Sequence, residues 1–339
     1  MNIHTTPADA VERMADLVRR RDPALETLWL QPFGEFQARF VALDTVMREV
    51  TDCLAADFRR RPADDFPMLY FAWGKCRVGS TPLNNLFGMA GMPSYYQPVK
   101  VTLRDALAGR PLTPWIVPSA AEQPHIFSKE TAGPFVLAEC LFVALQALIE
   151  AGYPQDKLHV IMLDREPASA LASWLDKLET RAPAGVLLRN YVIAALNAIR
   201  VEDYARRQGL PVTHYVYEAS KEAVTSVRVL FDRLGIAGRF TEDTVTDWRE
   251  TGQLQSEKSR IIFPDEPEFY TTAGIHGSDI AYRYRARPTA SLTGFQRETL
   301  ERCGVNDVYR ASVQACVRDF GLDASTAARL FGHATEAAA

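Results

Sequence analysis

Residues 69–87 read Leu-Tyr-Phe-Ala-Trp-Gly-Lys-Cys-Arg-Val-Gly-Ser-Thr-Pro-Leu-Asn-Asn-Leu-Phe, and this stretch decides the fold. Its apolar start predicts a buried strand, its two glycines predict a turn, and Ser80, Thr81 and Pro82 suit the first turn of a helix. A helix N-terminus gathers backbone N–H groups at the positive end of the helix dipole, and Lys75 and Arg77 add two full charges there. The sequence therefore predicts an anion-binding loop between a strand and a helix.

The loop has nearly the spacing of the Walker A motif. Gly74 and Gly79 stand at the glycine positions of G-x-x-x-x-G-K-[ST], and Thr81 stands at its last position. Ser80 occupies the place of the Walker lysine, which contacts the β- and γ-phosphates in nucleoside triphosphatases. The cation lies within the loop instead, at Arg77. This pattern favours a phosphate cradle used for something other than ATP hydrolysis. The alternative at this point is a strand–turn–helix corner without a ligand.

Composition places the chain among soluble globular proteins. Its 339 residues are 47% hydrophobic and 24% charged, with a formal net charge of −4, so nucleic acid is not an expected partner. The five cysteines are scattered, which favours reduced thiols and a cytoplasmic location. No apolar signal core is found at the N-terminus, and the most apolar candidate helix, 135–151, is too short to span a bilayer. We therefore expect no transmembrane segment; the oligomeric state stays open.

Strands and helices alternate from residue 68 onward, and this order predicts the fold class. We expect an α/β fold of three layers, in which helices cover both faces of a mainly parallel central sheet. In such sheets, ligands bind at the carboxyl ends of the strands. After the first strand, further strands are expected at 95–101, 125–129, 158–163 and 212–217.

The two ends of the chain are expected to be helical. Residues 1–66 are predicted to form a helical extension, with helices at 8–21 and 33–61. Residues 67–339 are predicted to form a single α/β domain that ends in C-terminal helices. Within this domain, residues 250–292 show little helical or strand periodicity.

A second constellation follows the strand predicted at 158–163. Arg165 stands at its end, and Ser169 and Ser173 are four residues apart, so they share one face of the next helix. An arginine with serine hydroxyls suits a phosphate monoester, which it binds through charge-assisted hydrogen bonds. Taken alone, these residues also fit an ordinary charged helix N-terminus.

Together the two stretches resemble the nucleotide-binding signatures of the sulfotransferases that use 3′-phosphoadenosine 5′-phosphosulfate (PAPS), in particular bacterial members. Residues 77–81 match the family's loop K/R-x-G-S/T-T, and Arg165-Glu-Pro with Ser173 eight residues on matches its second signature. The resemblance implies that Arg165 and Ser173 hold the 3′-phosphate of PAPS and that the loop holds its 5′-phosphosulfate. The loop residues implied are Lys75, Arg77, Val78, Gly79, Ser80 and Thr81.

Two further segments extend the resemblance, which covers roughly residues 68–305. Tyr217-Glu-Ala is similar to the family's Y-E-D segment, so Tyr217 is implied to lie beside the adenine; a core tyrosine is the alternative. Residues 281–288 resemble a basic aromatic segment that closes over the donor, with Arg285 and Arg287 as candidates and Arg283 also open. The chain departs from the family at Pro82, where many members have tryptophan, and at Ala219, which replaces the aspartate.

The resemblance also implies a reaction. A sulfuryl group would move from PAPS to a hydroxyl or amine of a small-molecule, lipid or glycan acceptor, without a metal ion, leaving adenosine 3′,5′-bisphosphate (PAP). Arg77 would stabilise the leaving phosphate and Lys129 the sulfuryl oxygens, while Glu130 would take the acceptor proton. His125 and His276 are alternative bases. The competing functions are a small-molecule kinase with an altered P-loop and a non-catalytic nucleotide-binding protein.

Overall fold

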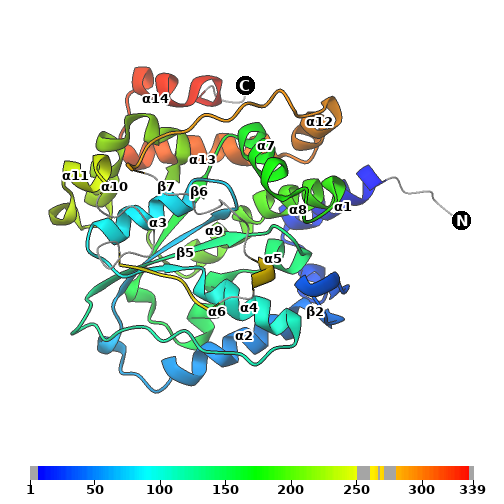
Figure 1. The fold of residues 1–339 in the computed structure, drawn as a ribbon, viewed down its shortest axis with the longest axis horizontal. Coiled ribbons are helices and arrows are strands. Elements are labelled where there is room, and N and C mark those ends of the chain that lie inside the picture. Colours follow the sequence, from blue (N-terminus) through cyan, green and yellow to red (C-terminus); the bar gives the residue numbers. More distant parts are fainter. Residues whose placement is uncertain (1–6, 250–259, 266–267, 271–279, 336–339) are drawn as a thin grey trace, which may run out of the picture.

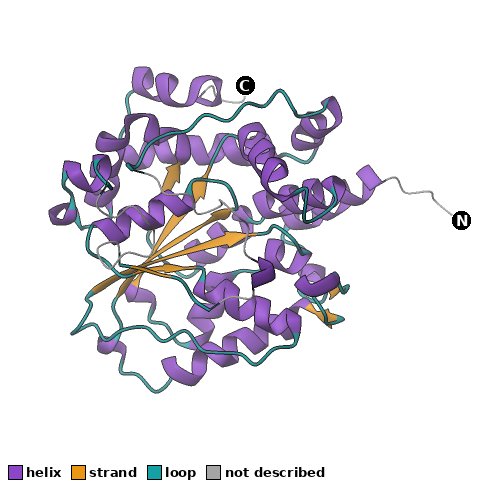
Figure 2. Ribbon diagram, viewed as in Figure 1, coloured by secondary structure: helices purple, strands orange, loops and turns teal. Residues whose placement is uncertain are grey.

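A parallel sheet of six strands forms the centre of the computed structural model, which describes residues 7–249, 260–265, 268–270 and 280–335. The strand order is β7-β6-β3-β5-β4-β8, and every neighbouring pair is parallel. Figure 2 shows the strands fanned between two layers of helices. The predicted three-layer α/β fold is therefore confirmed. The strands are β3 (Met68–Lys75), β4 (Ser94–Tyr96), β5 (His125–Ala132), β6 (Leu158–Asp164), β7 (Val212–Val216) and β8 (Ile261–Ile262).

Helices cover both faces of the sheet, with α3, α10 and α13 on one side and α2, α4 and α6 on the other (Figure 1). Side chains of β3 alternate between these layers, as the pleat requires: Tyr70 packs with the first group and Phe71 with the second. The helices are α1 (Pro7–Arg20), α2 (Leu43–Phe58), α3 (Ser80–Met89), α4 (Pro98–Ala108), α5 (Leu137–Leu141), α6 (Ala144–Ala151), α7 (Pro167–Leu178), α8 (Ala184–Leu196), α9 (Ala198–Arg207), α10 (Ala223–Arg233), α11 (Glu242–Thr246), α12 (Gly294–Arg302), α13 (Val305–Phe320) and α14 (Ala324–Phe331).

The register of the sheet brings the carboxyl ends of β3, β5, β6 and β7 to the same end of the sheet. Lys75 at the end of β3 pairs with Ala132 of β5, and Asp164 of β6 pairs with Val216 of β7. The segments that follow these strands therefore leave the sheet side by side. These segments include the loop after β3, Arg165 after β6 and Tyr217 after β7.

Two strand predictions were wrong in extent. Residues 95–101 do not form one strand, because β4 ends at Tyr96 and α4 begins at Pro98, whose missing N–H costs nothing at a helix start. β5 runs on to Ala132 rather than ending at 129, since it pairs with β3 along its whole length. Both errors change where site residues point.

The N-terminal part is only partly helical. α1 and α2 form, but between them lie β1 (Trp29–Leu30) and β2 (Val41–Ala42), which pair antiparallel. The helix predicted at 33–61 is therefore shortened to α2. Val18 of α1 and Leu54 of α2 are fully buried in the same apolar cluster as Phe71 of the sheet.

One helical run in the described residues, Ala184–Arg207, is long and apolar enough by length and composition to cross a membrane. It comprises α8 and α9, and 67% of its most apolar window is buried within the fold. Core helices of soluble proteins share these properties, so the fold is compatible with a soluble protein.

Candidate functional site

The loop after β3 makes the predicted turn into α3. Its backbone enters the left-handed region twice, at Arg77 (φ 73°) and Gly79 (φ 78°), and a positive φ is uncommon for a residue with a side chain. Packing also requires glycine at position 79, because a Cβ there would clash with the ring of Tyr217. The glycine thus allows the aromatic ring of Tyr217, the residue after β7, to lie directly on the loop.

The two signature motifs meet at this loop. The Nε of Arg77 donates to the Oγ of Ser173 on α7 over 3.0 Å. Arg165 also contacts Arg77, since its Nη1 donates to the carbonyl oxygen of Arg77 over 3.2 Å. Arg165 is buried, and its Nε has no hydrogen-bond partner within the described part of the chain. Residues almost ninety positions apart in the sequence therefore form one contact group.

Tyr217 and the arginine-rich segment close this group. The guanidinium of Arg165 lies 4.7 Å from the ring centroid of Tyr217, and its Nη2 donates to the carbonyl oxygen of Arg285 over 3.1 Å. The backbone N–H of Arg285 donates to the hydroxyl of Tyr217 over 2.9 Å. Arg285 thus joins the group through its backbone, while its side chain is exposed.

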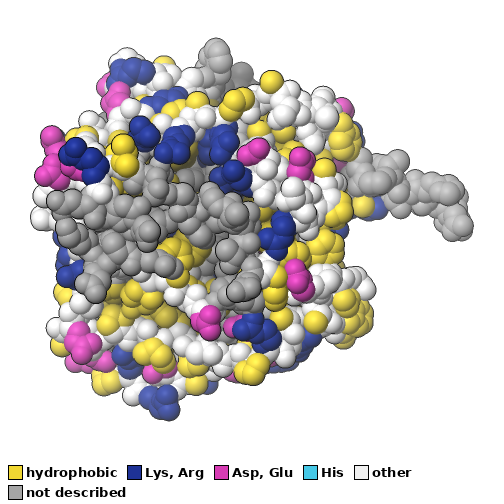
Figure 3. Space-filling view, viewed as in Figure 1, with side chains coloured by type: hydrophobic (Ala, Val, Ile, Leu, Met, Phe, Trp, Pro, Cys, Tyr) yellow, Lys and Arg dark blue, Asp and Glu magenta, His cyan; other side chains and the backbone are white. Residues whose placement is uncertain are grey.

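Arg287, two residues after Arg285, pairs with Asp176 on α7 and lies near the group. Its Nη1 lies 3.6 Å from Asp176, and its charge reaches Arg77. The pKa of Arg77 is lowered, first by burial and then by the charges of Arg287 and Arg165. Figure 3 shows that Lys and Arg side chains gather on this face, in the area between α3 and α7 of Figure 1. Cations held this close together favour a bound anion.

Lys75 has a different position from the one predicted. It is buried and forms an ion pair with Asp164, the last residue of the neighbouring strand β6. The same carboxylate oxygen accepts the backbone N–H of Arg165 over 2.8 Å. The geometry therefore favours a role for Lys75 in fixing the start of the second motif over the direct phosphate contact predicted from the sequence.

Lys129 lies under the N-terminus of α3. Its Nζ is 3.4 Å from the Oγ of Ser80 and 3.6 Å from the ring centroid of Tyr96. Burial, together with the positive charges of Lys100 and Arg77, lowers the pKa of Lys129 to about 7. A substantial share of this side chain is therefore the neutral amine near pH 7.

Glu130 points away from Lys129, because neighbouring residues of a strand face opposite sides of the sheet. Its carboxylate accepts the backbone N–H groups of Val99 (2.9 Å) and Lys100 (3.2 Å) in the first turn of α4. Burial raises its pKa to about 7, although these hydrogen bonds oppose the shift. The prediction that Glu130 follows a strand end was wrong, and its geometry is that of a helix cap rather than a base.

The sequence offered two histidines as alternative bases. His125 is the first residue of β5, at the edge of the sheet opposite the loop, and its Nδ1 lies 3.2 Å from the hydroxyl of Tyr70. His276 lies outside the described residues.

A narrow pocket opens beside the loop, over the N-terminus of α3. Its volume of about 60 Å³ exceeds the roughly 10–15 Å³ that one water requires, so it has room for several waters or a small group. Four cationic side chains contribute to its wall, and the described lining contains neither carboxylate nor histidine. The lining residues are Cys76, Arg77, Ser80, Thr81, Tyr96, Gln97, Lys100, Arg104, Lys129, Thr131, Pro134, Phe135, Leu178 and Tyr270.

Sequence reasoning missed two of these cations, Lys100 and Arg104. Both belong to α4, and the first lies in the segment read as a strand. The signal that would have found them is Pro98, which suits a helix start, with the two cations four residues apart on one helix face.

Comparisons with family models, curated proteins and solved structures find no match for this chain. The resemblance to PAPS sulfotransferases therefore rests on the motif residues. Within the described residues, no group of three or more His, Cys, Asp or Glu side chains is arranged to hold a metal ion.

Proposed function

We propose that this chain is a sulfotransferase that moves a sulfuryl group from PAPS to a hydroxyl or amine of an acceptor. One observation carries the proposal: Arg77 of the first motif contacts both Ser173 and Arg165 of the second. PAPS differs from ATP in carrying a separate 3′-phosphate, so an enzyme that uses it needs two anion sites joined around one nucleotide. The contacts of Arg77 support such a pair.

The donor would be held at both ends. Arg165 and Ser173 suit the 3′-phosphate, and the buried Nε of Arg165 is a donor for which the described chain offers no acceptor. The backbone N–H groups at the start of α3, with Ser80 and Thr81, suit the 5′-phosphosulfate. Tyr217 supplies an aromatic surface next to Gly79, beside which the adenine would lie.

The transfer step balances with the groups at hand. The acceptor oxygen attacks sulfur, an O–S bond forms, and the bond from sulfur to the 5′-phosphate oxygen breaks, leaving PAP. Arg77 stabilises the charge that develops on that phosphate. The amine of Lys129 takes the acceptor proton, and the ammonium that results remains beside the sulfuryl oxygens. Because the sulfuryl group carries little charge, the step requires no metal ion.

We propose that the reaction takes place in the cytoplasm. The five cysteines, at positions 53, 76, 140, 303 and 316, are all free, as expected for a protein that folds among reduced thiols. The acceptor would be a small molecule, a lipid or a glycan.

Turnover with a defined donor tests the proposal. The protein is incubated with a cell extract and either PAPS or ATP with Mg²⁺, and mass spectrometry identifies new products. We expect acceptors that gain one sulfuryl group with PAPS, in the presence of EDTA, and the loss of these products in Arg77→Ala. Arg228→Ala is the matched control, because Arg228 is an exposed arginine on α10. Phosphorylated products that require ATP and Mg²⁺ would instead identify a kinase.

A further inference from the structure

The pocket beside the loop has a cationic wall that the transfer step leaves without a role. Lys100 and Arg104, one turn apart on α4, line it, and they are 3% and 4% exposed. Lysine and arginine are seldom buried to this degree unless they are paired, because removal of a charge from water is costly. The groups that surround these two cations therefore indicate which chemical class of ligand fits the pocket.

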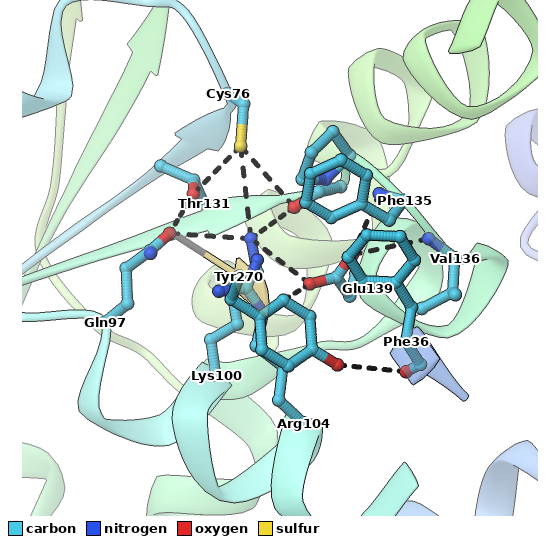
Figure 4. Close-up of polar contacts among 12 residues, drawn as sticks. Phe36, Cys76, Gln97, Lys100, Arg104, Thr131, Phe135, Val136, Glu139 and Tyr270 are labelled. Atoms are coloured by element: carbon cyan, nitrogen blue, oxygen red, sulfur yellow. Dashed lines mark hydrogen bonds and ion pairs between the residues drawn. The ribbon is translucent and has the colours of Figure 1, made fainter. Parts of the chain in front are cut away.

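The ammonium of Lys100 is surrounded mainly by neutral groups (Figure 4). It donates to the carbonyl oxygen of Gly133 and lies 3.5 Å from the amide oxygen of Gln97. The nearest carboxylate on this side, that of Glu139, is 3.7 Å away, beyond hydrogen-bond distance. Glu139 is instead bonded to Arg104, whose Nε donates to it over 2.6 Å.

Glu139 is already bonded to other donors. Its Oε2 accepts the backbone N–H groups of Phe135 and Val136, and the pKa of Glu139 is lowered because Arg104 and Lys100 outweigh the effect of burial. One ionised carboxylate thus serves two cations. An anion that enters the pocket would give Lys100 a charged partner within hydrogen-bond distance, which the 3.7 Å pair with Glu139 does not supply.

The rest of the wall is apolar and aromatic. Phe135, Leu178 and Tyr270 line the same pocket, and the guanidinium of Arg104 lies 4.0 Å from the ring centroid of Tyr270. The hydroxyl of Tyr270 donates to the carbonyl oxygen of Phe36, which fixes the ring in place. A ligand for this wall combines an anionic group with an aromatic or aliphatic body.

We propose that this pocket is the acceptor site and that the acceptor is a small hydroxyl compound with its own anionic group, which Lys100 binds and Arg104 supports. This inference rests on the proposed function, since the same pocket reaches the N-terminus of α3, where the sulfuryl group would lie. The narrow volume keeps the anionic group within a few bonds of the hydroxyl that is sulfated.

Binding of matched phenols tests the inference. The probes carry a carboxylate, a phosphate or a sulfate, and each is paired with an uncharged analogue, for example para-hydroxyphenylacetate with its methyl ester. Titration calorimetry is run on the wild type, Lys100→Met and Lys157→Met, with and without saturating PAP. Lys157→Met is the control, because Lys157 lies before β6 at the opposite edge of the sheet.

We expect the wild type to bind at least one anionic probe about tenfold more tightly than its analogue, the scale of one hydrogen bond between charged groups. Lys100→Met removes this preference while PAP affinity is retained, and Lys157→Met preserves it. Equal binding of acid and analogue by the wild type, or no binding of any acid, overturns the inference. Failure of PAP to bind contradicts the proposed function instead, and the comparison without PAP still decides the acceptor site.

Discussion

Replacement of Arg165 by alanine is expected to weaken the binding of PAP by about 1.5–3 kcal/mol, the contribution of a hydrogen bond to a charged group. This corresponds to a roughly 10- to 150-fold increase in Kd. Two of the donor groups of Arg165 already bind the carbonyl oxygens of Arg77 and Arg285, so one charge-assisted contact from Nε is the gain assigned to the ligand. Adenosine 5′-phosphate, which lacks the 3′-phosphate, should lose less than about threefold, since it makes no such hydrogen bond.

Titration calorimetry with both nucleotides measures the difference. The variant also loses the two carbonyl contacts, so thermal unfolding is recorded alongside. Arg200→Ala is the matched control: Arg200 is a similarly buried arginine, and it donates to the carbonyl oxygen of Leu141 over 2.6 Å, away from the loop. Equal losses for the two nucleotides in Arg165→Ala, or a selective loss of PAP binding in Arg200→Ala, would refute the 3′-phosphate assignment.

Three further predictions concern titratable side chains. If the amine of Lys129 is the base, kcat rises with pH through the pKa of Lys129, and Lys129→Arg is inactive although it keeps the charge. If Lys129 acts only as a cation, kcat falls as pH rises and Lys129→Arg stays active. Glu130→Gln should lower the free energy of unfolding by about 1–2 kcal/mol, because the α4 cap is weakened, and should leave kcat within about threefold of wild type. A decrease in kcat of roughly 10²–10⁴-fold would instead identify Glu130 as the base. Burial lowers the pKa of His214, but its hydrogen bonds with Asp319 and Glu202 outweigh this and raise it from 6.5 to about 8. The stabilisation from His214 is therefore present below pH 6.5 and is lost as pH rises through 8. Chemical unfolding of the wild type should show a decrease of about 2 kcal/mol in the free energy of unfolding over this range, and an unfolding free energy that does not change with pH would contradict the prediction.

The sequence was informative wherever a local pattern decides the structure. The apolar run before Lys75, the two glycines and the serine–threonine pair predicted a strand, a loop and a helix start, and β3, the loop and α3 form there. The alternation of strands and helices predicted the parallel sheet. Parallel strands bring their carboxyl ends to one end of the sheet, and for this reason Arg77, Lys129, Arg165 and Tyr217 were expected there; Lys129 instead lies within β5, three residues before its end.

The errors arose where neighbouring elements decide. β5 extends to Ala132 because β3 beside it offers hydrogen-bonding partners as far as Lys75, and no local signal records the length of that neighbour. This extension turns the Glu130 side chain toward α4. Residues 95–101 mislead because Val99 and Val101 favour strands, whereas Pro98 and the packing of α4 on α2 select a helix.

Packing also decides the partners of buried cations. Lys75 reads as a phosphate ligand from its position in the loop, but the adjacent strand β6 places Asp164 against it. Lys100 and Arg104 enter the pocket only because α5 brings Glu139 opposite α4. Such pairings depend on residues 30 or more positions away in the sequence, as for Arg104 and Glu139, which are 35 apart.

The central claim is that this chain binds a nucleotide through two separate anion sites, and a competition between PAP and ATP with Mg²⁺ tests it most directly. Titration calorimetry on the wild-type protein measures the Kd of each nucleotide under the same salt and pH. We expect PAP to bind at least about tenfold more tightly than ATP with Mg²⁺, because only PAP places a phosphate monoester on Arg165 and Ser173. Tighter binding of ATP with Mg²⁺ would contradict it.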